Sequence, residues 1–172
     1  FLYILEQKLN QSVQNEDITP QISLVISAYN EEEIIKEKLE NSLELDYPEE
    51  KLEIIVTNDG SKDNTSEIVK KYPQIKLLDF KKNRGKTQTH NEDVEIATGE
   101  IVVFSDANAI YKKDALRKLV RNFADDKVGA VCGELIYQNK QQSTSGEGEG
   151  IYWEYEKFLK KKESSIGSVM GN

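Results

Sequence analysis

The sequence predicts an α/β fold in which a mostly parallel β-sheet is flanked by helices. Three observations support this prediction. Short apolar runs rich in Ile and Val alternate with longer runs of helical composition. Most of the apolar runs end in polar or glycine-containing loops, as buried strands do where they leave a sheet. Strands that alternate with helices at this spacing are joined by right-handed crossovers and therefore lie parallel.

Residues 1–20 are expected to form a leader that precedes the domain. Apolar residues recur over 1–9 as in a short amphipathic helix, and 10–19 is polar and followed by Pro20, as in a linker. The domain is predicted to span residues 21–172. A chain of 172 residues is long enough for one domain with a single core.

Five apolar runs have the length and composition of strands. They cover residues 22–27, 54–56, 75–80, 101–104 and 128–132. Four helices are expected between or after them, at 31–42, 64–71, 87–97 and 115–123. Asn30 and Asp114 are placed to cap the first and the last helix, and Thr98-Gly99 ends the third. Cys132 ends the fifth strand and is expected to pack in the core.

Four loops follow the carboxyl ends of the predicted strands, which is where parallel sheets of this class bind ligands. The loops are 27–31, 58–61, 81–86 and 105–108. Three of them carry a carboxylate, and 81–86 is basic. Packing alone does not require acidic, amide, aromatic and basic side chains on one rim. Their convergence therefore predicts a functional site.

The loop at 105–108 is the strongest candidate for metal binding. A four-residue apolar run stops at Ser105 and Asp106, and Asn108 follows two residues later. Carboxylate and amide oxygens in this spacing suit a hard cation such as Mg²⁺ or Mn²⁺, which also binds phosphates. We therefore predict a metal-bound diphosphate at Asp106 and Asn108. The alternative is an ordinary turn, because Asp and Asn are common after strands.

Residues of the neighbouring loops have side chains suited to a nucleotide. Arg84 and Lys86 are expected to form charge-assisted bonds with phosphates, and the alternative is a solvated basic loop. Asp59 is suited to accept hydrogen bonds from the N–H edge of a base, while Tyr29 is suited to stack on the ring. The alternative for Asp59 is a cap of the following helix.

Composition argues against several other classes of protein. The formal net charge of −8 argues against a nucleic-acid partner, and a single cysteine excludes a disulfide framework within the chain. No apolar run reaches the ~18 residues needed to cross a bilayer. His90 is the only histidine and is expected to pack against neighbours or lie on the surface. The aromatic and basic stretch 151–163 is expected to dock on the sheet or, alternatively, to lie on a membrane surface.

The four loops together resemble the successive signatures of family 2 glycosyltransferases, which have the GT-A fold. The matching stretches are 26–32, 58–65, 83–86 with Asn91, and 105–108. The resemblance covers residues 22–172, and the ordered set of motifs is highly specific. It implies a nucleotide-sugar donor, most often UDP-linked, a divalent metal, and inverting transfer to an acceptor hydroxyl.

Position by position, the resemblance assigns most of the candidate residues to the donor site. It implies that Ala28, Tyr29 and Glu31 line the nucleoside pocket. It also implies that Asp59 meets the uracil edge and that Lys86 lies near the base or the phosphates.

Two positions depart from the family pattern. Asp106 matches the first acid of the family's DxD-like motif, but Asn108 stands where a second acid is usual. A neutral amide binds a cation less strongly than a carboxylate, so Asn108 is expected to act through water or not at all. Ser27 replaces a frequent proline, a change with little chemical consequence.

The resemblance also implies parts of the protein outside this stretch. The family's general base is a later Asp, expected beyond Asn172, so the catalytic residue is unknown, the fold is expected to be incomplete at its C-terminus, and this fragment is expected to transfer little or no sugar. Residues 152–156 resemble a helix of membrane-bound members that make cell-envelope polysaccharides.

The full-length protein is therefore expected to be membrane-embedded, with this domain at the cytoplasmic face and soluble as a fragment. Residues 1–20 would then be juxtamembrane, and the acceptor would be a saccharide or lipid-linked.

Two other functions share this fold class. A sugar-phosphate nucleotidyltransferase should show a glycine-rich triphosphate loop near the first strand, and residues 28–31 do not form one. A non-catalytic nucleotide-sugar-binding or regulatory domain would keep the fold without turnover. Sugar transfer by the full-length protein would argue against this second alternative.

Overall fold

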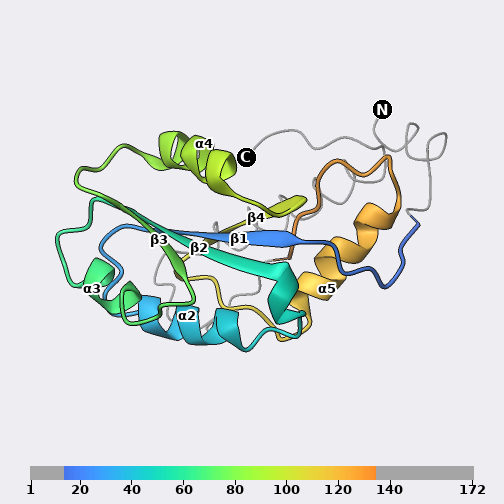
Figure 1. The fold of residues 1–172 in the computed structure, drawn as a ribbon, viewed down its shortest axis with the longest axis horizontal. Helices are drawn as coiled ribbons and strands as arrows, with labels where there is room; N and C mark the ends of the chain where they lie inside the picture. Colours follow the sequence, from blue (N-terminus) through green and yellow to red (C-terminus); the bar gives the residue numbers. More distant parts are fainter. Residues whose placement is uncertain (1–13, 135–172) are drawn as a thin grey trace, which may run out of the picture. The chain divides into compact units, whose positions relative to one another are not determined.

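A computed structural model of the protein describes residues 14–134, which form a four-stranded sheet flanked by helices on both faces (Figure 1). The elements are β1 (Ile22–Ala28), α2 (Ile35–Leu43), η1 (Glu49–Lys51), β2 (Leu52–Asp59), α3 (Thr65–Val69), β3 (Lys76–Phe80), α4 (Lys86–Ile96), β4 (Ile101–Asp106), α5 (Ala115–Val120) and η2 (Arg121–Ala124). The predicted leader helix and the stretch 151–163 lie outside the described residues. Within 14–134, no helix is long and apolar enough to cross a membrane.

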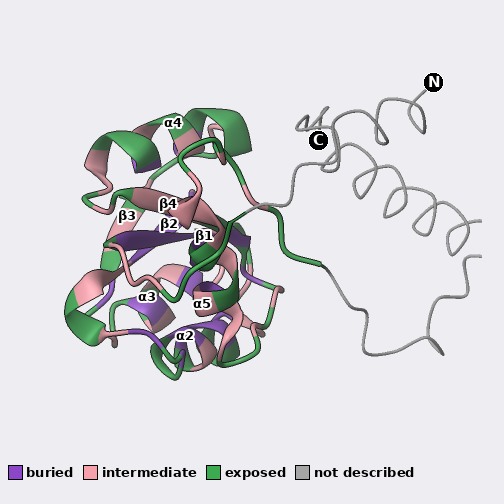
Figure 2. Cartoon of the chain, turned by 90° about the vertical axis from the view of Figure 1, so that its right-hand side faces the viewer, coloured by how far each residue is buried: buried purple, intermediate pink, exposed green. Residues whose placement is uncertain are grey.

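The sheet confirms the predicted α/β class. Its strands are ordered β3-β2-β1-β4, and each neighbouring pair is parallel. Helix α4 covers one face, whereas α2, α3 and α5 cover the other (Figures 1 and 2). Four of the five predicted strands and all four predicted helices are present, with shifted ends. Strands β1, β2 and β4 each extend further toward the predicted ligand-binding loops than expected.

The fifth predicted strand is absent from the described residues. Residues 128–132 are irregular, and Cys132 is exposed, so both the strand and the core position of this cysteine were predicted wrongly. Gly129 and Ala130 interrupt the two valines of this stretch and are exposed. Small residues in the middle of a run leave little side chain to pack, which removes the stabilisation that a strand needs.

The main core lies between the sheet and the helices α2, α3 and α5. Alternate residues of β1 point to this side because successive strand side chains face opposite ways. The buried cluster includes residues from β1, α2, β2, α3 and α5: Ile22, Leu24, Ile26, Ala28, Ile35, Leu39, Ile54, Val56, Val69, Leu116 and Val120. Figure 2 shows the central strand among the buried parts of the chain. Removing this apolar area from water stabilises the fold.

The face of the sheet beneath α4 is more polar. The Thr57 hydroxyl on β2 donates to Asp93 on α4, and both residues are buried. The ring of His90 packs on Phe104 with centroids 4.5 Å apart, and its Nδ1 lies 3.4 Å from Asp93. The expectation that His90 has a packing role is therefore confirmed.

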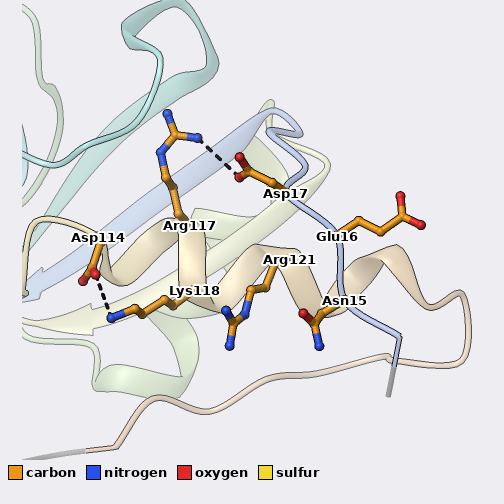
Figure 3. Close-up of a pocket in the computed structure, with 7 residues that line it drawn as sticks. All are labelled: Asn15, Glu16, Asp17, Asp114, Arg117, Lys118 and Arg121. Atoms are coloured by element: carbon orange, nitrogen blue, oxygen red, sulfur yellow. Dashed lines mark ion pairs between the residues drawn. The ribbon is translucent and has the colours of Figure 1, made fainter. Parts of the chain in front are cut away.

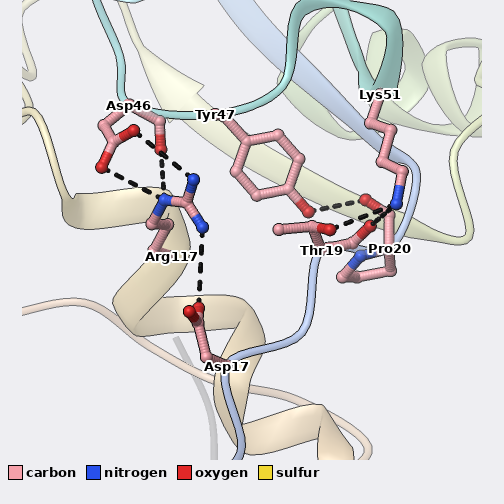
Figure 4. A network of polar contacts seen from close by, with 7 residues as sticks. All are labelled: Asp17, Thr19, Pro20, Asp46, Tyr47, Lys51 and Arg117. Atoms are coloured by element: carbon pink, nitrogen blue, oxygen red, sulfur yellow. Dashed lines mark hydrogen bonds and ion pairs between the residues drawn. The ribbon is translucent and has the colours of Figure 1, made fainter.

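Part of the predicted linker is held against the folded unit (Figure 4). The Tyr47 hydroxyl donates to the Pro20 carbonyl at 2.6 Å, and the Lys51 amine donates to the Thr19 carbonyl at 2.7 Å. The compact unit formed by the described residues spans Asn15–Gly133 and so includes this part of the linker. Residues 15–20 thus lead directly into β1 as an anchored segment.

The turn between α4 and β4 packs tightly against the start of β1. A Cβ added at Gly99 would lie 2.4 Å from the Ser23 backbone nitrogen and 2.5 Å from the Ile22 carbonyl carbon. Replacing Gly99 by alanine is therefore expected to lower the free energy of unfolding by about 1–3 kcal/mol through overpacking. Urea denaturation measures this change.

Gly129→Ala is the matched control, because a Cβ there meets no atom within 4 Å. Its free energy of unfolding is expected to stay within about 0.5 kcal/mol of the unsubstituted protein. Equal stabilities of the two variants would contradict the proposed close packing at Gly99.

Candidate functional site

The predicted site residues lie at or after the carboxyl ends of the four strands, and three of these strands are adjacent and in register. In the sheet register, Ser27 on β1 pairs with Thr57 on β2 and with Asp106 on β4. This register brings the ends of the three strands to one edge, as ligand binding in parallel sheets requires. Ala28 is buried at this edge, whereas the adjacent Tyr29 is 44% exposed and available to stack on a ligand.

The first two loops are joined by hydrogen bonds. The Ser61 hydroxyl accepts from the Asn30 amide at 2.9 Å, and Asn30 Oδ1 accepts from the Lys62 amide at 2.8 Å. The Glu31 amide donates to Thr65 Oγ1 at 2.8 Å. Asn30 has a positive φ of 57°, which asparagine tolerates better than most residues. Its prediction as a helix cap was wrong, because its side chain bonds to the neighbouring loop and α2 begins only at Ile35.

Carboxylates strengthen the same connection. Glu32 Oε2 accepts from the Asn64 backbone and side-chain nitrogens at 2.9 and 2.8 Å, while Asp63 Oδ2 accepts from the Glu32 amide at 3.1 Å. Burial raises the pKa of Asp63, but hydrogen bonds from Thr65 and Glu32 outweigh it, and the pKa lies below its ordinary value. From the sequence, Asp63 and Asn64 were considered only as caps of the helix that follows them and Glu32 only as an acidic residue of a first helical turn, so their bonds between the two loops were not predicted. Their only sequence signal is the density of short polar side chains after two strands.

Asp59 holds the third loop in place. Its side chain is only 8% exposed, and its two oxygens accept from the backbone amides of Arg84 and Gly85 at 2.8 and 3.0 Å. Gly85 has a φ of 86°, and Gly60 next to Asp59 has a φ of 73°, a conformation that glycine adopts readily. An ionised carboxylate has about four lone-pair sites, so these two bonds leave acceptor capacity for a ligand. The contact of Asp59 with a base stays a prediction.

Arg84 is engaged by the protein itself. Both terminal nitrogens of its guanidinium donate to the Glu92 carboxylate on α4, one of them at 2.8 Å. The guanidinium also lies over the Phe80 ring, 4.6 Å from its centroid. The structure therefore directs this side chain toward α4, and its contact with phosphates stays a prediction.

Lys86 and Asp106 connect the third and fourth loops. The Lys86 amine lies 2.6 Å from Asp106 Oδ1, and the two side chains are 60% and 57% exposed. Asp106 and Asn108 are exposed, whereas Ser105 and Ala107 are buried. This alternation presents the carboxylate and the amide to solvent together, as they must be if both bind one metal ion.

Glu31 lies close enough to this carboxylate to be affected by its charge. The pKa of Glu31 is raised above its ordinary value by burial first, and then by the negative charges of Asp63 and Asp106. Negative potential thus accumulates at the strand ends, which favours a cation.

The residues at this edge fit a divalent metal that is coordinated by the protein and by a phosphate group together. Residues 14–134 contain no cluster of three or more His, Cys, Asp or Glu suited to a metal. One carboxylate and one amide instead suit Mg²⁺ or Mn²⁺, because such ions complete their coordination with substrate phosphates and water. In the same part of the chain, the Ser27 hydroxyl is buried without a hydrogen-bond partner, and it lies in register with Asp106. A bound ligand or water can satisfy this hydroxyl.

A separate pocket lies beside the segment that enters β1, at the amino end of that strand (Figure 3). It is lined by charged and polar residues: Asn15, Glu16, Asp17, Asp114, Arg117, Lys118 and Arg121. Arg117 pairs with Asp17 at 3.6 Å, and Lys118 pairs with Asp114 at 2.6 Å. Asp114 occupies the N-cap position of α5 as predicted, but its side chain makes no capping hydrogen bond to the helix and pairs with Lys118 instead. Because four of its six charged side chains are paired with one another, we do not assign a ligand to the pocket.

Comparison with known sequences decides the family. Residues 23–170 match the family described as Glycosyl transferase family 2. The chain belongs to glycosyltransferase family 2. The similarity predicted from the four loop motifs is thereby confirmed.

Several curated family 2 proteins are similar to this chain. A poly-β-1,6-N-acetyl-D-glucosamine synthase of Staphylococcus epidermidis is 37% identical over 147 residues, which are 81% of this chain and 35% of that protein. The synthase of the same name from Staphylococcus aureus strain COL is 38% identical over 130 residues, which are 73% of this chain and 31% of that protein. The chain thus spans about a third of the length of these relatives.

Solved structures of glycosyltransferases are also similar. The mannosyltransferase PcManGT of Pyrobaculum calidifontis, in complex with GDP-Man and Mn²⁺, aligns with a TM-score of 0.66 and 33% identity over 74% of this chain and 40% of that one. TarS residues 1–349 of S. aureus, in complex with UDP-GlcNAc, align with a TM-score of 0.56 and 28% identity over 69% of this chain and 37% of that 1–349 chain. These similarities confirm the GT-A assignment for this family 2 domain.

Proposed function

We propose that this domain binds a UDP-linked sugar together with Mg²⁺ or Mn²⁺, and that the whole protein transfers the sugar with inversion to an acceptor hydroxyl. The observation that carries the proposal is the contact of Lys86 with Asp106 at the strand ends, on the same rim as Glu31 and the exposed Tyr29. A carboxylate suits a cation, an amine suits a diphosphate, and an exposed aromatic ring suits a nucleoside.

Each residue would act on a different part of the donor. Asp106 would hold the metal, with Asn108 binding it directly or through water. A bound divalent cation neutralises a diphosphate and stabilises it as a leaving group. Lys86 would bind the phosphates, Tyr29 would stack on the base, and Asp59 would accept from the base edge.

A general base is not among these residues. The expectation that it follows Asn172 stays a prediction, as does the low transfer activity expected of this chain by itself.

We further propose UDP-GlcNAc as the donor. Two findings support this choice: the names of the poly-β-1,6-N-acetyl-D-glucosamine synthases that are 37–38% identical to this chain, and the UDP-GlcNAc complex of TarS. The complex of PcManGT with GDP-Man makes GDP-mannose the competing candidate. By analogy with the synthases, the acceptor would be a saccharide.

Isothermal titration calorimetry tests the proposed donor. UDP-GlcNAc is expected to bind in the presence of Mn²⁺ at least tenfold more tightly than GDP-mannose, because a base-reading site discriminates between hydrogen-bonding edges. Metal removal with a chelator is expected to weaken binding. Tighter binding of GDP-mannose would overturn the choice of donor, and binding of neither nucleotide sugar would overturn the proposed function.

The family match favours glycosyl transfer over the nucleotidyltransferase alternative. A non-catalytic domain of the same family is distinguished by the whole protein: transfer from UDP-GlcNAc would exclude it. We also propose that the whole protein is membrane-embedded with this domain at the cytoplasmic face. Recovery of the whole protein in the soluble fraction would contradict that location.

A further inference from the structure

Helix α2 places a lysine directly beneath the candidate metal loop. Lys38 is 0% exposed, and it lies on the buried face of the helix with Ile35 and Leu39, which belong to the apolar core. Its ammonium donates to Ser105 Oγ at 2.8 Å and to the Ala109 carbonyl. It also lies over the Tyr111 ring, 3.9 Å from the centroid. All of these partners are neutral.

A buried ammonium with neutral partners is unfavourable compared with an apolar side chain. Burial lowers the pKa of Lys38 to about 8, while the charge of Asp106 acts in the opposite direction. Core packing alone would be better served by leucine or methionine at this position. The hydrogen bonds of the lysine therefore indicate a role that an apolar residue cannot fill.

The partners of Lys38 flank the predicted metal ligands. Ser105 directly precedes Asp106, and Ala109 directly follows Asn108. One ammonium thus joins the two ends of the loop from the α2 side of the sheet. The Ala109 amide donates to the Asp106 carbonyl at 3.2 Å, which closes the turn between them.

The same helix holds the loop at a second point. The Asn41 side chain donates to the Tyr111 carbonyl at 2.9 Å and accepts from the Tyr111 amide at 2.8 Å. Lys38 and Asn41 lie on successive turns of α2 and together fix residues 105–111. Of these two contacts, the one made by Lys38 is nearer to the predicted ligands.

We propose that Lys38 is a positioning residue that holds the backbone of residues 105–109 so that Asp106 and Asn108 face a shared metal. The proposal rests on the proposed function for the identity of the ligand. Lysine fits this role because it has the reach and three donors to bond to a hydroxyl and a carbonyl at the same time.

Lys38→Met tests the proposal, because methionine matches the unbranched apolar stem of lysine as far as Cε and lacks the amine that forms the hydrogen bonds. Calorimetry measures the affinity for UDP with and without Mn²⁺, at a temperature where thermal melts show each variant to be folded. Affinity in Mn²⁺ is expected to fall at least tenfold, while affinity without metal stays within twofold. A loss confined to the metal-dependent part would not arise from general destabilisation.

Ser42→Ala is the matched control. Ser42 is buried on the same helix, and its hydroxyl donates to the Lys38 carbonyl at 2.8 Å without touching the loop. Its affinity for UDP is expected to stay within twofold of the unsubstituted protein in both conditions. Unchanged binding by Lys38→Met, or equal losses in both variants, would overturn the positioning role.

Amide hydrogen exchange separates this proposal from the proposed function. If the unsubstituted protein binds no UDP, the proposed function fails, and exchange in residues 105–111 decides the role of Lys38. Exchange there is expected to be at least tenfold faster in Lys38→Met than in Ser42→Ala, with residues 52–56 of β2 unchanged. Equal exchange in residues 105–111 of the two variants would overturn the proposal.

Discussion

Replacing Asp106 by alanine is expected to weaken Mn²⁺-dependent binding of UDP-GlcNAc by more than about a hundredfold, because losing even the hydrogen-bond partner of a metal ligand costs about 10–100-fold and Asp106 is the proposed ligand itself. Asp106 supplies the only carboxylate of the loop at 105–108, and its side chain is 57% exposed at the end of β4. Without it, Asn108 would be the remaining ligand from this loop, and a neutral amide holds a divalent cation weakly. Calorimetry with UDP-GlcNAc, with and without Mn²⁺, measures the effect.

Asp114→Ala is a closely matched control for this substitution. Each aspartate pairs with a lysine at 2.6 Å on the surface, Asp106 with Lys86 and Asp114 with Lys118. Exposed pairs of this kind contribute about 0–1 kcal/mol, so the two variants should have similar thermal stability. Binding by Asp106→Ala at the level of Asp114→Ala would remove the proposed metal site.

The sheet was predictable because its information is local. The apolar run 22–27 is a buried strand and the run 101–104 is a partly buried strand, and polar residues mark where each ends. Once the strands are parallel, their carboxyl ends must share an edge, so Asp59 and Asp106 could be placed on one rim from the sequence. The prediction for 128–132 failed because its two valines satisfy the local pattern of a strand, whereas the small residues Gly129 and Ala130 between them offer little side chain to pack.

The connections between loops were not predictable from these patterns. Asn30 is a residue type that often caps helices. Only the fold reveals that the backbone amide of Lys62 lies 2.8 Å from the side-chain oxygen of Asn30. Lys38 presents the same difficulty, because a charged residue on a helix is normally solvated. Arg84 was expected at the phosphates, but sequence alone does not show that Glu92 faces it across the start of α4.

The loop motifs of the family therefore have two kinds of function in this structure. Tyr29, Lys86 and Asp106 are exposed and available to a ligand, whereas Asn30 and Asp63 hold loops together. Asp59 belongs to both groups, because it fixes a loop and retains free acceptor positions beside the site. Its replacement should therefore affect stability and binding together.

Replacing Asp59 by alanine is expected to lower the free energy of unfolding by about 2–4 kcal/mol. The Arg84 and Gly85 amides would lose their acceptors, and each such loss costs about 1–3 kcal/mol where water does not replace the bond. Residues 81–86 would then be free to leave the strand ends, so Lys86 would no longer be held near Asp106. UDP-GlcNAc affinity should fall at least about tenfold, the equivalent of about 1.4 kcal/mol. Urea denaturation and calorimetry measure the two effects.

Asp79→Ala separates the position of Asp59 from the mere loss of a carboxylate. Asp79 also accepts two hydrogen bonds near a strand end, from Asn58 at 2.7 Å and from Ser66 at 2.6 Å. It is exposed, and neither of these bonds involves residues 81–86. Water can replace its bonds, so its loss of stability should be smaller, about 1 kcal/mol. Faster amide exchange in residues 81–86 should occur only in Asp59→Ala. If both variants kept that loop protected, Asp59 would not be the residue that holds it, and its buried carboxylate would need another explanation.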